Sequence, residues 1–331
     1  MIIVKKSIIP WVGGKAKLMW IINLLAPLKY GRSIDVFGGS ATVTLNLECP
    51  HNKLKVYNDY NANLVNLMRC AKERPLGLIK EIGFLPLNSR DDFEMCKRFI
   101  SQEEFAEEDL KAELELTEIM FPPPQAEELK HIMLKKSADK DLKRAAMYYK
   151  LLRYSFNSNG DTFGGKNCDI RRFFVDIWKF SRYFKRVVVE NKDFEAVIKQ
   201  YDRADAFIYC DPPYYEAEGF YAVIFTAEDH IRLRDTLKEA KGKVMVSYNN
   251  ADYIKALYEE FYIFYTTRPN SMAKKEGEVY EELIITNYNP KEFLPEKTGQ
   301  LNLFSFLLNA EPEGEYKLIH QPITNEKEPT T

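Results

Sequence analysis

The four residues Asp211-Pro212-Pro213-Tyr214 constrain this chain more than any other stretch of its sequence. They follow an apolar run, residues 206–210, that predicts a buried strand ending in a sharp loop. The Asp211 carboxylate can accept a hydrogen bond from one hydrogen of an amine, and the Pro212 carbonyl can accept from the other hydrogen of the same amine. The prolines stiffen the loop, and Tyr214 adds a ring face for stacking. The loop therefore suits a planar group with an exocyclic amine, although a turn that merely closes a strand has the same composition.

Length and composition are those of a globular protein. The chain has 331 residues, of which 45% are apolar and 29% charged, enough for one large domain or two smaller ones. No apolar run reaches the length of a membrane span, and the N-terminus lacks a secretory signal, so we expect a cytoplasmic protein without membrane contact. The five cysteines and four histidines lack metal-ligand spacing, so we expect reduced thiols and no metal.

The charge distribution is uneven, although the net charge is only −2. From Glu103 to Glu128 there are ten acidic residues against one lysine, whereas from His131 to Arg186 there are fourteen Lys and Arg against five Asp. A basic region of this kind is typical of phosphate contact, although charged helix faces are often only solvated.

Periodicity predicts two stretches of alternating strands and helices around a helical segment. The first stretch has strands at 33–36 and 54–57 and helices at 18–25 and 41–47. Residues 62–150 are mostly helical by pattern, interrupted by Phe121-Pro122-Pro123-Pro124. In the second stretch we expect strands at 187–189, 206–210, 243–247, 261–267 and 282–286 and helices at 194–200, 227–240 and 252–260. The polar tail after about residue 310 is expected to fray.

The glycine turn after the first strand suggests a nucleotide-like ligand. Gly38 and Gly39 would let a ligand approach the backbone, and the helix that follows would favour a carboxylate or phosphate. Asp59 lies 20 residues beyond Gly39, where an acid often binds a ribose hydroxyl. Capping a helix is the alternative role for Asp59. On these residues alone, NAD and S-adenosylmethionine are equally compatible.

Two further loops favour the methyl donor. Trp11 and Lys15 flank a second glycine turn and pair an aromatic with a basic group. Asp193 could accept a hydrogen bond from an adenine amine, and Phe194 could pack on the adenine ring. Three successive strands would then carry polar residues at one rim of a sheet, where open α/β folds bind ligands.

Four motifs occur in a fixed order along the chain. They are Pro10-Trp11-Val12-Gly13-Gly14-Lys15, Asp35-Val36-Phe37-Gly38-Gly39-Ser40, Asn58-Asp59 and Asp211-Pro212-Pro213-Tyr214. In this order and spacing the set resembles the Dam-type (class alpha, D12) site-specific DNA adenine-N6 methyltransferases, through most of residues 7–290. Residues 95–145 do not match, so the recognised DNA sequence is not predicted.

The resemblance implies a fold class, a domain division and binding partners. The fold class is α/β, a Rossmann-like S-adenosylmethionine-dependent methyltransferase sheet with helices on both faces, plus an inserted, mainly helical target-recognition domain. Residues 1–61 and 172–290 would form the catalytic domain, 62–171 the DNA-binding insertion and 291–331 a C-terminal extension with a flexible tail. The implied cofactor is S-adenosyl-L-methionine and the implied partner is double-stranded DNA, with a separately encoded restriction endonuclease as a further expected partner. The protein would act in the cytoplasm of a prokaryote or be encoded by a phage.

The resemblance also implies site residues. The cofactor would contact Trp11, Gly13, Gly14, Lys15, Asp35, Phe37, Gly38, Gly39, Ser40, Asp59, Asp193, Phe194 and Asp211. The catalytic residues would be Asp211, Pro212, Pro213 and Tyr214. The turn-rich segment 153–165 resembles a DNA-contacting hairpin, and the DNA-binding residues would be Arg153, Asn157, Ser158, Asn159 and Lys166. Residues 247–249 resemble a later strand-end motif, and Arg268 to Glu282 the loop and strand that close the sheet.

The expected reaction is direct methyl transfer to the amine of a flipped adenine. Hydrogen bonds to Asp211 and the Pro212 carbonyl would localise the nitrogen lone pair, while the base stacks on Tyr214. Cys210, beside the motif, is expected to be a buried strand residue and not a nucleophile. Methylation of cytosine-N4 or of an RNA base, and a catalytically silent DNA-binding module, remain alternatives. A nicotinamide oxidoreductase is not favoured, because this sequence has no recognisable catalytic His or Lys-Tyr pair.

Overall fold

The computed structural model divides the chain into two compact units. The structure describes residues 5–11, 13–47, 49, 51–83, 89–101, 114–139, 141–156, 160–165, 170–216, 225–269, 279–293 and 315–322. The first unit, here the sheet unit, comprises Met1–Lys5, Lys15–Tyr60 and Lys192–Thr331; the second, the helical unit, comprises Lys6–Gly14 and Asn61–Asn191. Among the helices of the described ranges, none is both long and apolar enough to cross a membrane. The predicted domain boundaries stay a prediction, and the compact units begin and end at other residues.

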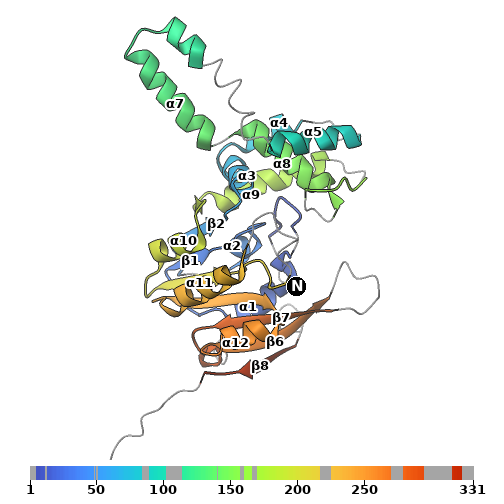
Figure 1. Cartoon of the computed structure of the whole chain (residues 1–331), viewed down its shortest axis with the longest axis vertical. Helices are drawn as coiled ribbons and strands as arrows, with labels where there is room; N and C mark the ends of the chain where they lie inside the picture. Colours follow the sequence, from blue (N-terminus) through green and yellow to red (C-terminus); the bar gives the residue numbers. More distant parts are fainter. Residues whose placement is uncertain are drawn as a thin grey trace, which may run out of the picture. The chain divides into compact units, whose positions relative to one another are not determined.

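A mixed eight-stranded sheet dominates the fold (Figure 1). The strands are β1 (Arg32–Asp35), β2 (Leu54–Asn58), β3 (Val187–Glu190), β4 (Ala206–Cys210), β5 (Lys243–Asn249), β6 (Tyr262–Pro269), β7 (Val279–Thr286) and β8 (Tyr316–His320). Their order is β3-β2-β1-β4-β5-β7-β6-β8. β1 runs parallel to both β2 and β4, and β4 runs parallel to β5. The direction of winding thus reverses between β1 and β4, and this switch point is where open α/β sheets bind ligands.

One strand departs from a simple doubly wound sheet. β7 lies between β5 and β6 and is antiparallel to both. The pairing places Glu282 of β7 opposite Asn249 of β5 and Thr266 of β6. The carboxyl-terminal half of β6 and the amino-terminal half of β7 therefore lie at the same rim as the end of β5.

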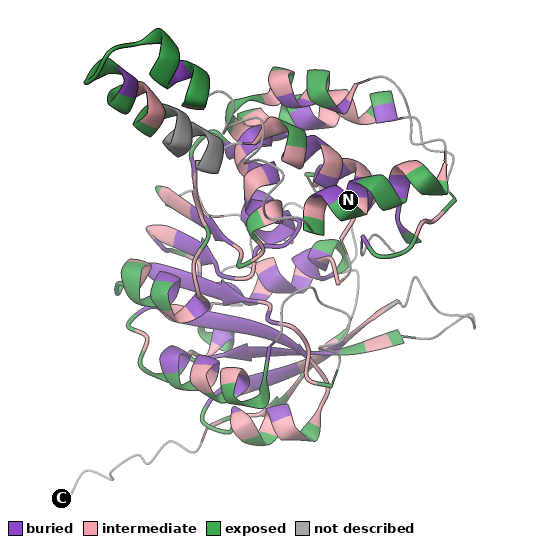
Figure 2. Cartoon of the chain, turned by 45° about the horizontal axis from the view of Figure 1, so that its top comes forward, coloured by how far each residue is buried: buried purple, intermediate pink, exposed green. Residues whose placement is uncertain are grey.

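Helices cover both faces of the sheet. In the sheet unit they are η1 (Lys15–Leu18), α1 (Met19–Leu25), α2 (Thr42–Asn46), α10 (Phe194–Tyr201), α11 (Ala227–Lys238), α12 (Asp252–Leu257) and η5 (Pro290–Glu292). Phe207 and Tyr209 of β4 share one buried cluster with α1. On the opposite face, His230 of α11 meets Tyr248 of β5, with 2.8 Å between Nδ1 and the hydroxyl. All five residues of β4 are buried, as are the inner strands drawn purple in Figure 2.

The helical unit is built around one buried helix, α8 (Leu142–Tyr154), which packs against α3 (Ala62–Glu73), α4 (Pro75–Ile82) and α5 (Arg90–Ser101). The other described helices are residues 114–120, α7 (Gln125–Asp139), η3 (Ile170–Phe173) and α9 (Phe174–Phe184). After α8 the chain turns back, and Ser155 and Phe163 form an antiparallel bridge. This bridge lies in the segment predicted to be turn-rich, whose contact with DNA stays a prediction, and the helices confirm the mostly helical character predicted for the described part of residues 62–150.

The predicted alternation of strands and helices is confirmed, but the expectation of a frayed tail is wrong for part of it. Residues 316–320 form β8, which pairs antiparallel with β6. Tyr316 and Leu318, two residues apart, pack on the α1 cluster, because alternate strand residues share a face. The helix predicted over 252–260 ends at Leu257, and the strand predicted over 282–286 begins at Val279.

Candidate active site

The site lies where β1 and β4 end, at the switch point of the sheet. Asp211 follows β4 directly, and the glycine turn at residues 38–39 follows β1. Ser247, near the end of the neighbouring β5, and Lys15, the first residue of η1, complete the surroundings of Asp211. All of these residues belong to the sheet unit.

Asp211 is held by an ion pair and a hydrogen bond. The Nζ of Lys15 lies 2.6 Å from Asp211 Oδ2, and the Lys15 side chain is only 4% exposed. Ser247 Oγ donates to Asp211 Oδ1 at 2.9 Å. Because a hydroxyl has one hydrogen, the 2.8 Å contact between Tyr209 and Ser247 requires the tyrosine to donate. Lys15 and Ser247 therefore both donate to the Asp211 carboxylate, and Tyr209 orients Ser247 by donating to it.

Burial controls the acidity of Asp211. Burial raises its pKa above the ordinary value, while the nearby ammonium of Lys15 and then the Ser247 hydroxyl limit the rise. A carboxylate has about four acceptor positions, so one oxygen can hold a lysine or serine and still accept from a ligand amine. The preceding Cys210 is fully buried, and burial keeps its thiol protonated by raising its pKa, consistent with the predicted structural role.

Tyr214 is fixed by one contact to its ring and one to its hydroxyl. Lys15 Nζ lies 5.0 Å from the ring centroid, a cation–π distance. The hydroxyl donates to Oε2 of Glu282, which is fully buried on β7. Arg268 of β6 in turn donates from Nε to Glu282 Oε1 at 2.5 Å. Glu282 and Arg268 were assigned only to the closing part of the sheet by sequence, because β7 pairs with β5 only through the folded topology.

Asp35 is a second carboxyl at the switch point and, unlike Asp211, is buried. Thr44 donates to its Oδ2 from both the backbone nitrogen, at 3.0 Å, and the hydroxyl, at 2.6 Å. Burial raises the pKa of Asp35 to about 7, in spite of these two hydrogen bonds. Ser40 and Thr42 share a hydrogen bond of 2.8 Å at the start of α2. Asp35 thus stabilises the turn between β1 and α2 and titrates near neutral pH.

The glycine turn is fastened to the end of β2. A side chain at Gly38 would collide with the Tyr57 ring, since a Cβ there would lie 2.3 Å from it. Gly39 has φ of 48° and donates its amide to Asp59 Oδ2 at 2.9 Å. Asp59 therefore orders the turn, and binding of a ribose hydroxyl stays a prediction for it.

Asn58 joins the loops that follow three strands. Its Nδ2 donates to the carbonyls of Val36, at 2.9 Å, and Lys192, at 3.0 Å, and its Oδ1 accepts from the Lys192 amide at 2.9 Å. The side chain is 1% exposed. The sequence places Asn58 in a motif with Asp59. Its role in connecting these loops is not predictable from the motif, because Lys192 is 134 residues away in the chain.

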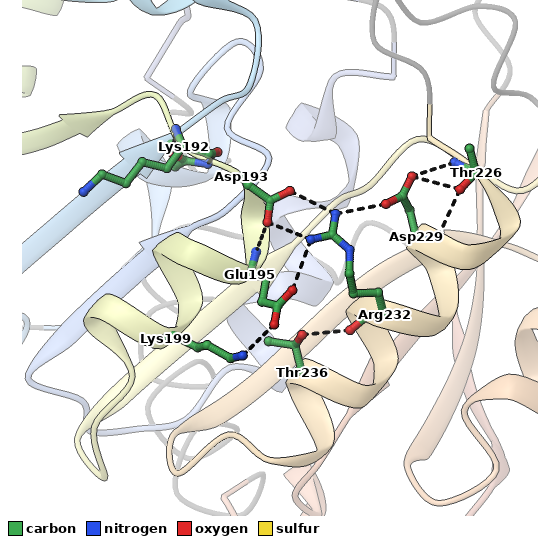
Figure 3. A network of polar contacts seen from close by, with 9 residues as sticks. Lys192, Asp193, Glu195, Lys199, Thr226, Asp229, Arg232 and Thr236 are labelled. Carbon is green, nitrogen blue, oxygen red and sulfur yellow. Dashed lines mark hydrogen bonds and ion pairs between the residues drawn. The ribbon is translucent and has the colours of Figure 1, made fainter.

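Asp193 is held by Arg232 from α11 (Figure 3). Asp193 caps α10 through the Glu195 amide at 3.0 Å and forms a bidentate pair with Arg232, with both distances 2.9 Å. Burial opposes the ionised form of Asp193, but hydrogen bonds from Arg232 and the Glu195 amide lower its pKa. The Arg232 guanidinium also lies 3.9 Å from the Phe194 ring centroid. Sequence reasoning missed Arg232, which is 39 residues away in the chain from Asp193.

Phe194 belongs to an aromatic group with Phe37. Their ring centroids are 5.8 Å apart, and Phe225 lies 5.7 Å from Phe194. The structure therefore brings together most of the predicted cofactor residues of the sheet unit. The three rings are tilted against one another, and Phe194 and Phe225 are buried.

The remaining predicted residues lie in the helical unit. The Trp11 carbonyl accepts from the Gly14 amide at 3.2 Å, and Gly13 has φ of 75°, so the predicted glycine turn is present. The Arg153 guanidinium donates to the Ile8 carbonyl and lies 3.5 Å from the Phe173 ring centroid. Asn157, Ser158, Asn159 and Lys166 lie outside the described residues, so their DNA contacts stay predictions. Among the described side chains, no group of three or more His, Cys, Asp or Glu could hold a metal ion.

A mixed α/β sheet that changes winding direction beside the Asp211 carboxylate belongs to the class of open α/β folds that bind ligands at the carboxyl ends of their strands. The family model of the D12 class N6 adenine-specific DNA methyltransferases matches residues 11–272. The chain belongs to this family, and it is a DNA adenine-N6 methyltransferase, as its motifs predicted.

Two relatives with curated descriptions agree with the family. The chain is 27% identical over 300 residues to the type II methyltransferase M1.LlaDCHI of Lactococcus lactis subsp. cremoris, covering 84% of this chain and 94% of that protein. It is 26% identical over 157 residues to the type II methyltransferase M.CviBI of Paramecium bursaria Chlorella virus NC1A, covering 44% of this chain and 58% of the viral protein.

The buried Asp35 carboxyl predicts a pH dependence of stability. Its pKa is about 7 in the folded chain and 3.8 in its ordinary state, so the folded form binds a proton more tightly than the unfolded form. The contribution of this group to stability therefore falls as the pH rises through this window. The melting temperature of the wild type, relative to Asp35→Asn, should fall from about pH 5 to about pH 8. A constant difference across this range would contradict titration of Asp35.

Proposed function

We propose that this methyltransferase transfers a methyl group from S-adenosylmethionine to the N6 amine of an adenine flipped out of duplex DNA. The observation that carries the proposal is the Asp211 carboxylate, which is 20% exposed at the switch point and held by Lys15 and Ser247. Asp211 needs a fixed position, because a hydrogen bond to the substrate amine must form at the angle at which methyl transfer occurs.

The residues at the switch point fit the proposed cofactor. S-adenosylmethionine supplies an electrophilic methyl group on a positively charged sulfonium. Asp35 lies at the end of β1, and a sulfonium bound nearby would favour its ionised form, because burial otherwise raises the pKa of Asp35 to about 7. Asp59 and the glycine turn would hold the ribose, while the partly exposed Phe37, backed by the buried Phe194, would contact the adenine.

In this mechanism Asp211 and Pro212 bind the two hydrogens of the adenine amine. These hydrogen bonds draw the nitrogen toward a tetrahedral geometry and localise its lone pair, which the ring otherwise delocalises. The raised pKa of Asp211 makes the carboxylate a stronger acceptor, and it can take the proton that the nitrogen releases after transfer. Tyr214 stacks on the base and excludes water from one of its faces.

The helical unit offers a surface for the DNA backbone. On α9, residues 177, 180 and 184 are buried, whereas residues 175, 178, 179, 182 and 183 are exposed. The exposed set recurs at intervals of three and four residues, so it occupies one helix face. This face carries Lys179 and Arg182 together with Trp178, which is 46% exposed, and Tyr183, which is 51% exposed. Cations can neutralise phosphates, and such aromatic groups can pack on the sugar backbone.

The names of the two relatives support a role in restriction and modification. Both are described as type II methyltransferases. By this proposal the chain methylates a defined site and thereby protects it from a separately encoded endonuclease.

The proposed reaction is tested by incubating the protein with labelled S-adenosylmethionine and unmethylated duplex DNA, then digesting the DNA to nucleosides. The proposal expects label in N6-methyladenine. Label in N4-methylcytosine, the principal alternative for the same amine clamp, or the absence of label on DNA would overturn it.

Replacing the central carboxylate should abolish transfer while leaving the protein able to bind DNA. Asp211→Ala removes the acceptor for one amine hydrogen, and loss of one such contact typically lowers a rate about 100-fold or more. Single-turnover methylation and DNA affinity are measured on the same preparation. Substantial transfer by Asp211→Ala would contradict the role assigned to this carboxylate.

Reversing a charge on α9 should weaken DNA binding at every sequence. Arg182→Glu is expected to lower the affinity for duplex DNA and to reduce the slope of log K against the logarithm of the salt concentration by about one. Lys29→Glu is the matched control, because Lys29 is exposed on the loop that precedes β1, at the rim opposite the site. Equal affinities and salt slopes for Arg182→Glu and Lys29→Glu would contradict the assignment of this face.

A further inference from the structure

Two charged residues near Tyr214 lie outside the proposed amine clamp of Asp211 and Pro212. Glu282 lies on β7, and Arg268 lies on the adjacent β6. We propose that this buried pair positions the Tyr214 ring for stacking against the flipped base. The inference rests on the proposed function, since it concerns a base that has left the duplex.

The geometry joins the three side chains in a line. Tyr214 donates its hydroxyl hydrogen to Glu282 Oε2, and Arg268 donates to the other carboxylate oxygen at 2.5 Å. In the β6–β7 register Thr266 lies opposite Glu282, so Arg268 is its diagonal neighbour on the same face of the sheet. The Arg268 guanidinium also lies 4.4 Å from the Tyr280 ring centroid. Two paired strands therefore fix the carboxylate that binds Tyr214.

The chemistry makes this contact persistent. The Glu282 carboxylate is removed from solvent, since its side chain is 0% exposed and that of its partner Arg268 is 12% exposed. An ionised carboxylate only accepts hydrogen bonds, so the Tyr214 hydroxyl must donate to it. Burial raises the pKa of Tyr214 well above its ordinary value, and the charges of Asp211 and Glu282 raise it further. Tyr214 therefore keeps its proton and its partner.

This arrangement assigns the ring, and not the hydroxyl, to the substrate. The hydroxyl is committed to Glu282, while Lys15 lies 5.0 Å from the ring centroid. Without Glu282 the ring could rotate about its side-chain bonds, and a flipped base would meet a less ordered surface. Arg268 and Glu282 act through Tyr214, so they are positioning residues.

The test uses Tyr214→Phe, which keeps the ring and the Arg268–Glu282 pair but removes the hydroxyl. The substrate is duplex DNA that carries the site methylated by the wild type, with adenine or fluorescent 2-aminopurine at the target position. We expect Tyr214→Phe to lower the single-turnover rate about 10-fold, the loss of one hydrogen bond to a charged group, and to reduce the fluorescence gained on flipping. The KM for S-adenosylmethionine should stay within about twofold of wild type, since the contact does not bind the cofactor.

A second variant shows whether Glu282 acts through the tyrosine. Glu282→Gln should lower the rate by a similar factor, and the double variant with Tyr214→Phe should be no slower than Tyr214→Phe alone. Arg268→Lys, which keeps the charge, should retain more activity than Arg268→Met. If Glu282→Gln or the double variant does not fold, Tyr214→Phe decides the proposal alone.

Wild-type rate and fluorescence in Tyr214→Phe would overturn the proposal, as would additive losses in the double variant. If the wild type itself neither methylates adenine nor brightens 2-aminopurine, the proposed function fails instead. The two failures are therefore distinguishable.

Discussion

The ion pair between Lys15 and Asp211 is the interaction on which the rest of the site depends. Both groups are removed from most solvent, and burial of an isolated carboxylate at a strand end costs several kcal/mol unless a cation compensates it. Lys15 provides that cation from η1, and it also lies near the ring of Tyr214. One buried ammonium thus connects the acceptor of the substrate amine with the ring on which the base stacks.

The strand order explains why this pair can be so well supported. Because β4 lies between β1 and β5, Asp211 at its end can be reached by Ser247 from β5, while Asp35 ends the strand on its other side. The inserted β7 then brings Glu282 to the same rim. Asp211 is paired with Lys15, and Glu282 is paired with Arg268. Asp35 accepts hydrogen bonds from Thr44 and has a pKa of about 7. A positively charged ligand would complete this balance.

Sequence patterns predicted the part of the site that is local in the chain. The run before Asp211 predicted β4, and the glycine turn predicted the loop between β1 and α2, because each motif is continuous with the element that positions it. The partners of those motifs were not predictable in the same way. Arg232 on α11 pairs with Asp193 at the start of α10, a helix far from α11 in the sequence. Glu282 contacts Tyr214 only because β7 lies between β5 and β6. Periodicity gives no strand order, and the short alternating stretch at β8 was overlooked within a polar tail.

The central claim, that an ionised Asp211 held by Lys15 accepts the substrate amine, is tested most directly by the pH dependence of methyl transfer in Lys15→Met. Since the ammonium lowers the pKa of Asp211, its removal should raise that pKa further, and the acidic limb of the rate profile should move to higher pH. The comparison is made at saturating cofactor and in the Asp35→Asn background, so that Asp35 does not contribute to the limb. A shift to higher pH is the predicted result; an active Lys15→Met variant whose limb stays in place would contradict the account.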